Sequence, residues 1–260
     1  MAMIIHTITG TGTPTNTITT GTAMTDPVTL PALYRLLAFL SPAFPIGAFT
    51  YSHGLEQVID AGGVTDPAEL SAWLEDILRY GAGRSDAILM KETRRAALLS
   101  DKDRLEELRD LGLALQPTKE RHLETSAQGT AFFEQAAKSW MPDNDTPAGE
   151  LFRLMAEQKI DPWPYPVALG LVSAAHAIPE QAAVTAYLHA FAANLISVAV
   201  RAVPLGQSDG QKVLAGLEQV IFDVAGQAAA SGLDGLGTST FLADIASMAH
   251  ETQYSRLFRS

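Results

Sequence analysis

The sequence contains no cysteine. Disulfide bonds, thiolate metal sites and cysteine nucleophiles are therefore excluded. Basic residues are also scarce, because 18 Lys and Arg stand against 29 Asp and Glu, which gives a formal net charge of -11. Phosphate binding needs clustered Lys and Arg, so this balance argues against a nucleic-acid partner.

Neither a secretion signal nor a membrane span is visible. The first residues, Met1–Gly12, lack both a basic segment and a continuous apolar segment. The longest apolar run, Ala186–Val200, is shorter than the roughly 18–20 residues that a span needs, and it carries His189, Asn194 and Ser197. These observations predict a soluble, cytoplasmic protein without a membrane partner, in which this run is a buried helix.

Long stretches in which apolar and polar residues alternate are also missing, so β-strands are not expected. Helical spacing is common instead, and it is clearest after Asp66, Pro67 and Glu69, which suit a helix N-cap, its first position and its third. The apolar residues that follow lie at i, i+3, i+4, i+7 and i+8: Leu70, Trp73, Leu74, Ile77 and Leu78. The sequence therefore predicts an all-α fold.

The predicted fold is a single globular domain of about ten helices over residues 26–260, and a hydrophobic fraction of 47% is ample for its core. The segment before it, Met1–Thr25, is rich in Thr and has few large apolar side chains. Such a segment cannot offset its own ordering entropy. We expect a disordered extension there, with a weak strand over Met3–Ile8 as the alternative.

Three further helices are predicted with specific boundaries. Ser52 is expected to cap a helix over Ser52–Ala61, and Thr118 a long helix that ends near Trp140. Gly129 lies in the middle of that long helix, which costs about 1 kcal/mol relative to alanine unless close packing requires it. Ser208 is expected to cap one continuous helix over Asp209–Ala230.

The adjacent Ser52 and His53 invite a hydrolase interpretation, with Asp60 or Asp86 orienting the histidine. Adjacent helical residues point about 100° apart, however, and therefore cannot form a nucleophile–base pair with each other. The sequence also lacks a Gly-x-Ser-x-Gly elbow between a strand and a helix. A small helical hydrolase or small-molecule-binding protein that uses Ser52 and His53 remains the alternative to a non-catalytic protein.

The six histidines are scattered, and no two of them stand four residues apart on one helix. Their spacing does not resemble a metal-ligand set. We expect no cofactor and no metal site, and His53 is the one histidine whose position makes it worth testing.

The stretch Leu40–Glu56 is unusually dense in proline, glycine and aromatic residues. Its pattern is Pro42-x-x-Pro45-x-Gly47-x-Phe49-x-x-Ser52-x-Gly54-Leu55-Glu56. This pattern resembles the signature of the UreF family of urease accessory proteins. Two later blocks, Arg201–Gln211 and Tyr254–Ser260, are also similar to the family and occur in the expected order.

The resemblance covers the chain from about Leu33 to Ser260. It implies a non-catalytic chaperone for nickel insertion that forms a homodimer, binds UreD (also called UreH) and recruits the GTPase UreG. The assembly carries nickel to apo-urease. The partner-binding residues that it implies are Pro45, Gly47, Phe49, Tyr51, Ser52, Gly54, Glu56, Arg201, Gly206, Gln207, Gln211, Tyr254, Arg256, Leu257 and Phe258.

The segment Gly206–Gln211 resembles a phosphate loop only superficially. It lacks Gly-Lys-Ser/Thr and follows a helix rather than a strand. Two interpretations remain open for it. Gln207 and Gln211 either satisfy backbone groups of a tight turn or face a partner.

The tail places Arg256 and Arg259 on either side of Leu257 and Phe258, at the end of an acidic chain. Leaving the two apolar side chains exposed would forfeit roughly 1.5–3 kcal/mol of burial for each. We therefore expect the tail to dock on the protein itself or on a partner, with terminal fraying as the alternative.

Overall fold

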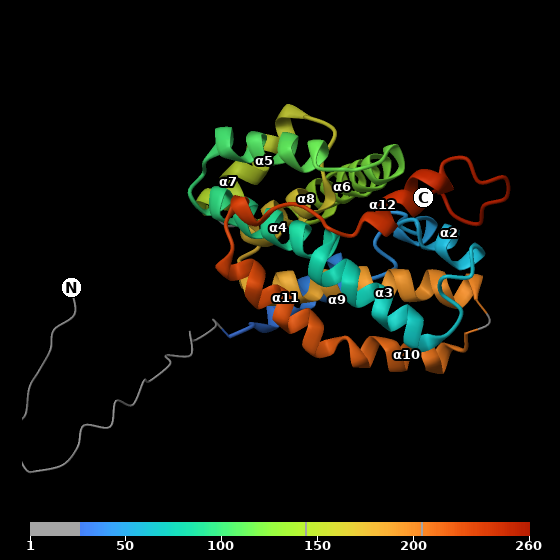
Figure 1. The fold of residues 1–260 in the computed structure, drawn as a ribbon. Helices are drawn as coiled ribbons and strands as arrows, with labels where there is room; N and C mark the ends of the chain where they lie inside the picture. Colours follow the sequence, from blue (N-terminus) through green and yellow to red (C-terminus); the bar gives the residue numbers. More distant parts are fainter. Residues whose placement is uncertain (1–26, 144, 204) are drawn as a thin grey trace, which may run out of the picture.

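The computed structural model describes residues 27–143, 145–203 and 205–260 (Figure 1). These residues form α-helices and two short 3-10 helices and contain no strand, so the all-α prediction is confirmed. The predicted disordered extension, Met1–Thr25, lies outside the described residues. The helices are α1 (Leu30–Phe39), η1 (Ala48–Thr50), α2 (Leu55–Asp60), α3 (Pro67–Tyr80), α4 (Ala82–Leu98), α5 (Lys102–Ala114), α6 (Lys119–Ser139), α7 (Pro147–Gln158), α8 (Tyr165–Ala175), α9 (Glu180–Ala202), α10 (Gln207–Gly216), α11 (Glu218–Ala230), η2 (Leu233–Gly235) and α12 (Phe241–His250).

Two apolar helices occupy the centre of the protein. Helix α8 is buried from Pro166 to Ala175 and packs mainly against α4 and α6. Helix α9 contacts α2, α3, α4, α8, α10 and α11, and Figure 1 shows it running alongside α10. The expected buried helix around Ala186–Val200 is thus a core element.

Helix α9 is also long and apolar enough to pass a length and composition test for a membrane span. Half of its most apolar window is buried against the rest of the protein, however. The core helix of a folded domain meets the same test. Because α9 contacts several other helices, we assign it as a core helix of this domain.

Two of the predicted helix starts are confirmed. The Asp66 side chain accepts hydrogen bonds from the backbone N–H groups of Ala68 and Glu69 and caps α3. Thr118 accepts from the N–H of Arg121 and caps α6. Both side chains satisfy backbone donors that the first turn of a helix leaves without a partner.

Two other boundaries were predicted wrongly. Helix α2 begins at Leu55 rather than at Ser52, because His53 and Gly54 both have positive φ and cannot continue a helix. The expected single helix over Asp209–Ala230 is two helices, α10 and α11, bent by 42° at the buried Leu217. The bend keeps both helices against α9 and α3.

The Ser208 cap is also wrong, since α10 begins at Gln207 with Gly206 as its N-cap. Gly129, by contrast, has the close packing that its position in α6 requires. A Cβ atom there would lie 2.0 Å from the carbonyl oxygen of Trp163 and 2.6 Å from the backbone nitrogen of Tyr165. The glycine therefore lets the connection into α8 cross α6 at backbone contact distance.

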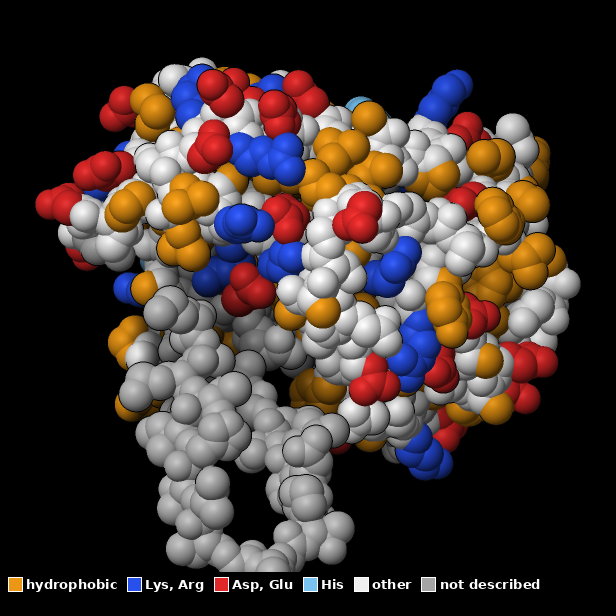
Figure 2. All heavy atoms as spheres, turned by 60° about the vertical axis from the view of Figure 1, so that its left-hand side comes forward, with side chains coloured by type: hydrophobic (Ala, Val, Ile, Leu, Met, Phe, Trp, Pro, Cys, Tyr) orange, Lys and Arg blue, Asp and Glu red, His pale blue; other side chains and the backbone are white. Residues whose placement is uncertain are grey.

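The surface charges do not separate into patches of one sign on the face that Figure 2 shows. Acidic and basic side chains alternate there with small apolar groups. On α5 the same mixing appears as ion pairs within one helix, for example Lys102 with Glu106 at 2.8 Å and Arg104 with Glu107 at 2.8 Å. Both pairs are in contact with solvent and therefore contribute little to stability.

Candidate functional site

The signature loop, Leu40–Glu56, connects α1 to α2 along a path set by two glycines. Gly47 and Gly54 have φ values of 70° and 77°, in the left-handed region that glycine adopts without strain. A Cβ atom on Gly54 would also lie 2.9 Å from the backbone nitrogen of Ser247 in α12. This glycine therefore lets the loop pack directly on α12.

The C-terminal tail, residues 251–260, lies along this loop. The N–H of Arg259 donates to the carbonyl of Thr50 at 2.7 Å. The N–H and hydroxyl of Ser52 both donate to the carbonyl of Ser260. Figure 1 shows the C-terminus next to α2 and α12. Of the three possibilities for the tail, docking on the protein itself holds for Phe258, which is 6% exposed, but not for Leu257, which is 72% exposed.

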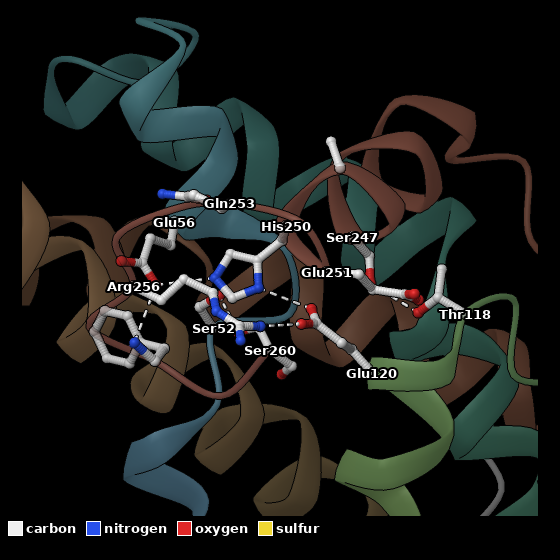
Figure 3. Close-up of polar contacts among 12 residues, drawn as sticks. Ser52, Glu56, Thr118, Glu120, Ser247, His250, Glu251, Gln253, Arg256 and Ser260 are labelled. Atoms are coloured by element: carbon white, nitrogen blue, oxygen red, sulfur yellow. Dashed lines mark hydrogen bonds and ion pairs between the residues drawn. The ribbon is translucent and has the colours of Figure 1, made fainter.

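Glu56, buried in the first turn of α2, is the main acceptor for the tail. Its carboxylate accepts the N–H of Leu257 at 2.6 Å and the N–H of Phe258 at 3.0 Å. One of its oxygens also lies 3.0 Å from Nε2 of His250 in α12 (Figure 3). A single buried carboxylate thus joins α2, α12 and the tail.

His250 is fully buried between two carboxylates. Its second nitrogen, Nδ1, lies 2.8 Å from Glu120 of α6, and Arg256 of the tail donates to the other oxygen of Glu120 at 3.0 Å (Figure 3). An ionised carboxylate only accepts, and a neutral imidazole donates through one nitrogen. For both ring nitrogens to donate to carboxylates, the three groups must together carry one more proton than a neutral histidine and two ionised carboxylates do. We call Glu56, Glu120, His250 and Arg256 the tail clamp.

A second carboxylate of α6, Glu124, contacts the very end of the chain. It accepts the hydroxyl of Ser260 at 3.0 Å and pairs with Arg121. Burial alone would raise the pKa of Glu124, but the Arg121 guanidinium and then His53 lower it to about 2. This carboxylate is therefore ionised and able to accept a hydrogen bond near pH 7.

His53 is buried in the left-handed conformation, with Nδ1 3.8 Å from Glu124, beyond hydrogen-bond distance. Its ring meets the ring of Phe191 edge-on, and burial followed by Arg121 lowers its pKa to about 4. Ser52 donates to the tail instead of to His53. The two side chains do not form a nucleophile–base pair.

Arg201, at the end of α9, connects the second family block to the other two. It donates to the carbonyl of Phe49 at 2.9 Å, and its guanidinium lies 4.5 Å from the centroid of the Phe258 ring. Gly206, Gln207 and Gln211 lie exposed around the start of α10. In the part of the chain that the structure describes, these two glutamines make no hydrogen bond to the loop or the tail, and also none to the turn.

The predicted partner-binding residues divide by exposure. Tyr51, Ser52, Gly54, Glu56 and Phe258 are buried within the chain, whereas Pro45, Phe49, Arg201, Arg256, Tyr254 and Leu257 are exposed, the last two at 105% and 72%. The buried set holds the loop and tail in place. The exposed set, together with the exposed Gly206, Gln207 and Gln211, is available to a partner in this conformation.

Sequence reasoning missed His250, Glu120 and Glu124. No spacing in the sequence relates positions 56, 120 and 250. The one available signal was that His250 ends an amphipathic helix directly before the tail. The described residues contain no group of three or more His, Asp or Glu side chains arranged for a metal ion.

Comparison with known proteins gives a consistent result. A family model described as UreF matches residues 64–218. The urease accessory protein UreF of Rhodopseudomonas palustris (strain BisA53) is 48% identical over 245 residues, which cover 92% of this chain and 100% of the relative. The protein of the same name from Bradyrhizobium sp. (strain BTAi1) is 47% identical, over 88% of this chain and 92% of the relative. The UreF protein of Methylobacterium radiotolerans is 46% identical, over 87% of this chain and 96% of the relative.

Proposed function

This chain belongs to the UreF family of urease accessory proteins, and from that premise we propose that it is a scaffold for maturation of the urease nickel centre. In this proposal it binds UreD (UreH), recruits the GTPase UreG and helps to deliver nickel to apo-urease. It carries out no chemistry itself, and its curated relatives are likewise named as accessory proteins rather than as enzymes.

The observation that carries the proposal is the convergence of three separate stretches on one site. The signature loop, Arg201 and the tail are far apart in the sequence, and they meet through Glu56 and Phe258. The buried members fix the backbone, while the exposed members face solvent around them. Such an arrangement, with rigid support under an exposed aromatic and arginine-containing rim, suits protein recognition.

An apolar surface adjoins this site. Phe241, Leu242, Ile245 and Met248 occupy one face of α12, and each is at least half exposed. Helix α12 leads directly into the tail, where Tyr254 and Leu257 are also exposed. We name these six residues the α12–tail face and assign it to UreD (UreH), with UreG recruited to the resulting complex. Exposed apolar residues grouped in this way are typical of interaction sites.

Dimer formation belongs to the same proposal. The outer face of α1 carries a second exposed apolar group, Leu30, Leu33, Tyr34 and Leu37, at helical i, i+3, i+4 and i+7 spacing. We assign this face to pairing with a second copy of the chain in the cytoplasm. Sedimentation of Leu33→Glu as a monomer, with wild type as a dimer, is the expected result.

The proposal is tested by capture of UreD and UreG on immobilised protein. Leu257→Ala and Tyr254→Ala remove exposed apolar contacts without disturbing the tail clamp. We expect capture to weaken by about fivefold or more, since truncating a central interface residue costs above about 1 kcal/mol. Leu99→Ala is the matched control, because Leu99 is 70% exposed at the end of α4, outside this site.

Unchanged capture by both α12–tail face variants would contradict the assignment of this face. Equal loss with Leu99→Ala would show a general effect of surface substitution. Circular dichroism of each variant checks that the helical content is the same.

A further inference from the structure

A cavity of about 250 Å³ opens between the signature loop and helices α6, α8 and α9. Its walls near the loop are apolar and aromatic, formed by Phe44, Ile46 and Phe191 among others. Polar residues of the helices also line it, among them Asp86 of α4 and Tyr187 of α9. We call it the α9 cavity. A concave site with apolar walls and a few convergent polar groups is the usual form of a small-molecule site.

Among the described residues that line this cavity, Asp86 is a charged group that no ion pair balances. It is 7% exposed, and one of its oxygens accepts the hydroxyl of Tyr187 at 2.6 Å. Among the described residues, it makes no ion pair and no other hydrogen bond. The hydroxyl of Tyr165, which also lines the cavity, has no hydrogen-bond partner among them either. Two residues that line the α9 cavity, Asp86 and Tyr165, therefore each have an oxygen free to accept a hydrogen bond.

The local charges sum to one negative charge. Glu124 is paired with Arg121, and His53 is neutral near pH 7 because its pKa is lowered to about 4. Asp86 has no cation of its own, and burial raises its pKa to about 6, although Tyr187 and then Arg121 lower it. A buried carboxylate without a cation costs free energy, and a bound positive charge would remove that cost.

We propose that the α9 cavity binds a small organic cation, a primary ammonium group on an apolar or aromatic stem, with the ammonium at Asp86 and the stem against the aromatic walls. An ammonium group donates three hydrogen bonds, and the free oxygens of Asp86 and Tyr165 accept two of them. The tyrosine rings favour a cation over a neutral group. A dry cavity of about 150 Å³ holds benzene, so about 250 Å³ suits a ligand of roughly 8–12 non-hydrogen atoms.

The experiment is calorimetric titration of the full chain with three probes of one shape, phenethylammonium, the neutral 2-phenylethanol and the anionic 3-phenylpropionate. At about pH 7.5 we expect the ammonium probe to bind at least about tenfold more tightly than the alcohol, and the anion to bind most weakly. Lowering the pH to about 5 should weaken ammonium binding, because Asp86 is then protonated. The other ionisable groups that line the α9 cavity with Asp86 are Arg121, Glu124, Tyr165, Tyr187 and His189, and a smaller hollow on the other side of Asp86 adds His53 and Asp244.

Two variants locate the binding. Asp86→Asn retains an acceptor for Tyr187 and should remove the preference for ammonium over alcohol. Asp76→Asn, an exposed position on α3, is the matched control and should bind like wild type. Ala193 lines the cavity, so Ala193→Leu should narrow it and weaken the binding of both the ammonium and the alcohol probes.

Equal affinity for ammonium and alcohol in wild type would overturn the proposal. So would unchanged ammonium binding by Ala193→Leu, which remains informative if Asp86→Asn does not fold. Failure of the ammonium probe to bind at concentrations up to about 5 mM would also overturn it.

Discussion

Replacing Glu56 with alanine should release the C-terminal tail while leaving the helical core folded. The change removes the carboxylate that accepts the N–H groups of Leu257 and Phe258 and that contacts His250. Within the tail only Phe258 and Ser260 are buried, so it can leave its site and hydrate these backbone groups without unfolding the helical core. The effect is therefore local opening rather than global unfolding.

The size of the effect follows from the lost contacts. A hydrogen bond to a charged acceptor contributes about 1.5–3 kcal/mol, so two of them contribute at least about 3 kcal/mol to tail docking. Each 1.4 kcal/mol is about tenfold in an equilibrium constant, so the tail should open at least roughly 100-fold more often. The increase in the exchange rate of the tail cannot go beyond the rate of an unstructured chain.

Hydrogen exchange measured by mass spectrometry tests this directly. In Glu56→Ala, peptides covering residues 251–260 should exchange at least about 100-fold faster, while peptides from α8 keep their wild-type rates. Glu134→Ala, an exposed position on α6, is the control and should change neither. Wild-type protection of residues 251–260 in Glu56→Ala would refute the assigned role of Glu56.

Two further predictions concern pH and packing. The pKa of His53 is about 4 in the folded protein against 6.5 in a free side chain, so the unfolded chain binds more protons between these values, and stability is lost as pH falls from about 6.5 to about 4. Asparagine adopts the left-handed conformation readily, so His53→Asn should fold, and it should remove about 3 kcal/mol of this loss when the free energy of unfolding is measured by urea titration at several pH values. An unchanged dependence of that free energy on pH would contradict the prediction. Gly129→Ala should destabilise by several kcal/mol in the same assay because its Cβ meets the backbone of Trp163, whereas Gly226→Ala on α11, with nothing within 4 Å, should stabilise by up to about 1 kcal/mol. Equal effects of the two alanines would be inconsistent with the packing at α6.

Local signals explain which parts of the fold were predictable. Asp66 and Thr118 indicate helix starts because their side chains accept hydrogen bonds from backbone groups at most three positions away. Both predictions are confirmed. Gly129 is similar, because a glycine inside a helix has a cost that only close packing offsets.

The wrong boundaries have non-local causes. Ser52 is a good helix cap by residue type, but its hydroxyl and N–H are taken by the carbonyl of Ser260, more than 200 positions away. The break at Leu217 arises because α10 and α11 both pack against α9, which no local pattern reveals. Tertiary contacts override local preference at both places.

The site was predictable as a set of stretches but not as a structure. The family resemblance points to the loop, Arg201 and the tail, and these do meet. The tail clamp depends on His250 and Glu120, which have no sequence relationship to Glu56. A buried histidine between two carboxylates is visible only when three helices are placed together.

The central claim, that this chain is a scaffold that joins UreD and UreG, is tested most directly by size-exclusion chromatography with light scattering of the purified protein mixed with UreD and UreG. The account predicts one complex whose mass includes all three chains, in which Leu257→Ala lowers the fraction assembled and Leu99→Ala does not. Separate elution of wild-type protein from UreD and UreG under the same conditions would contradict it.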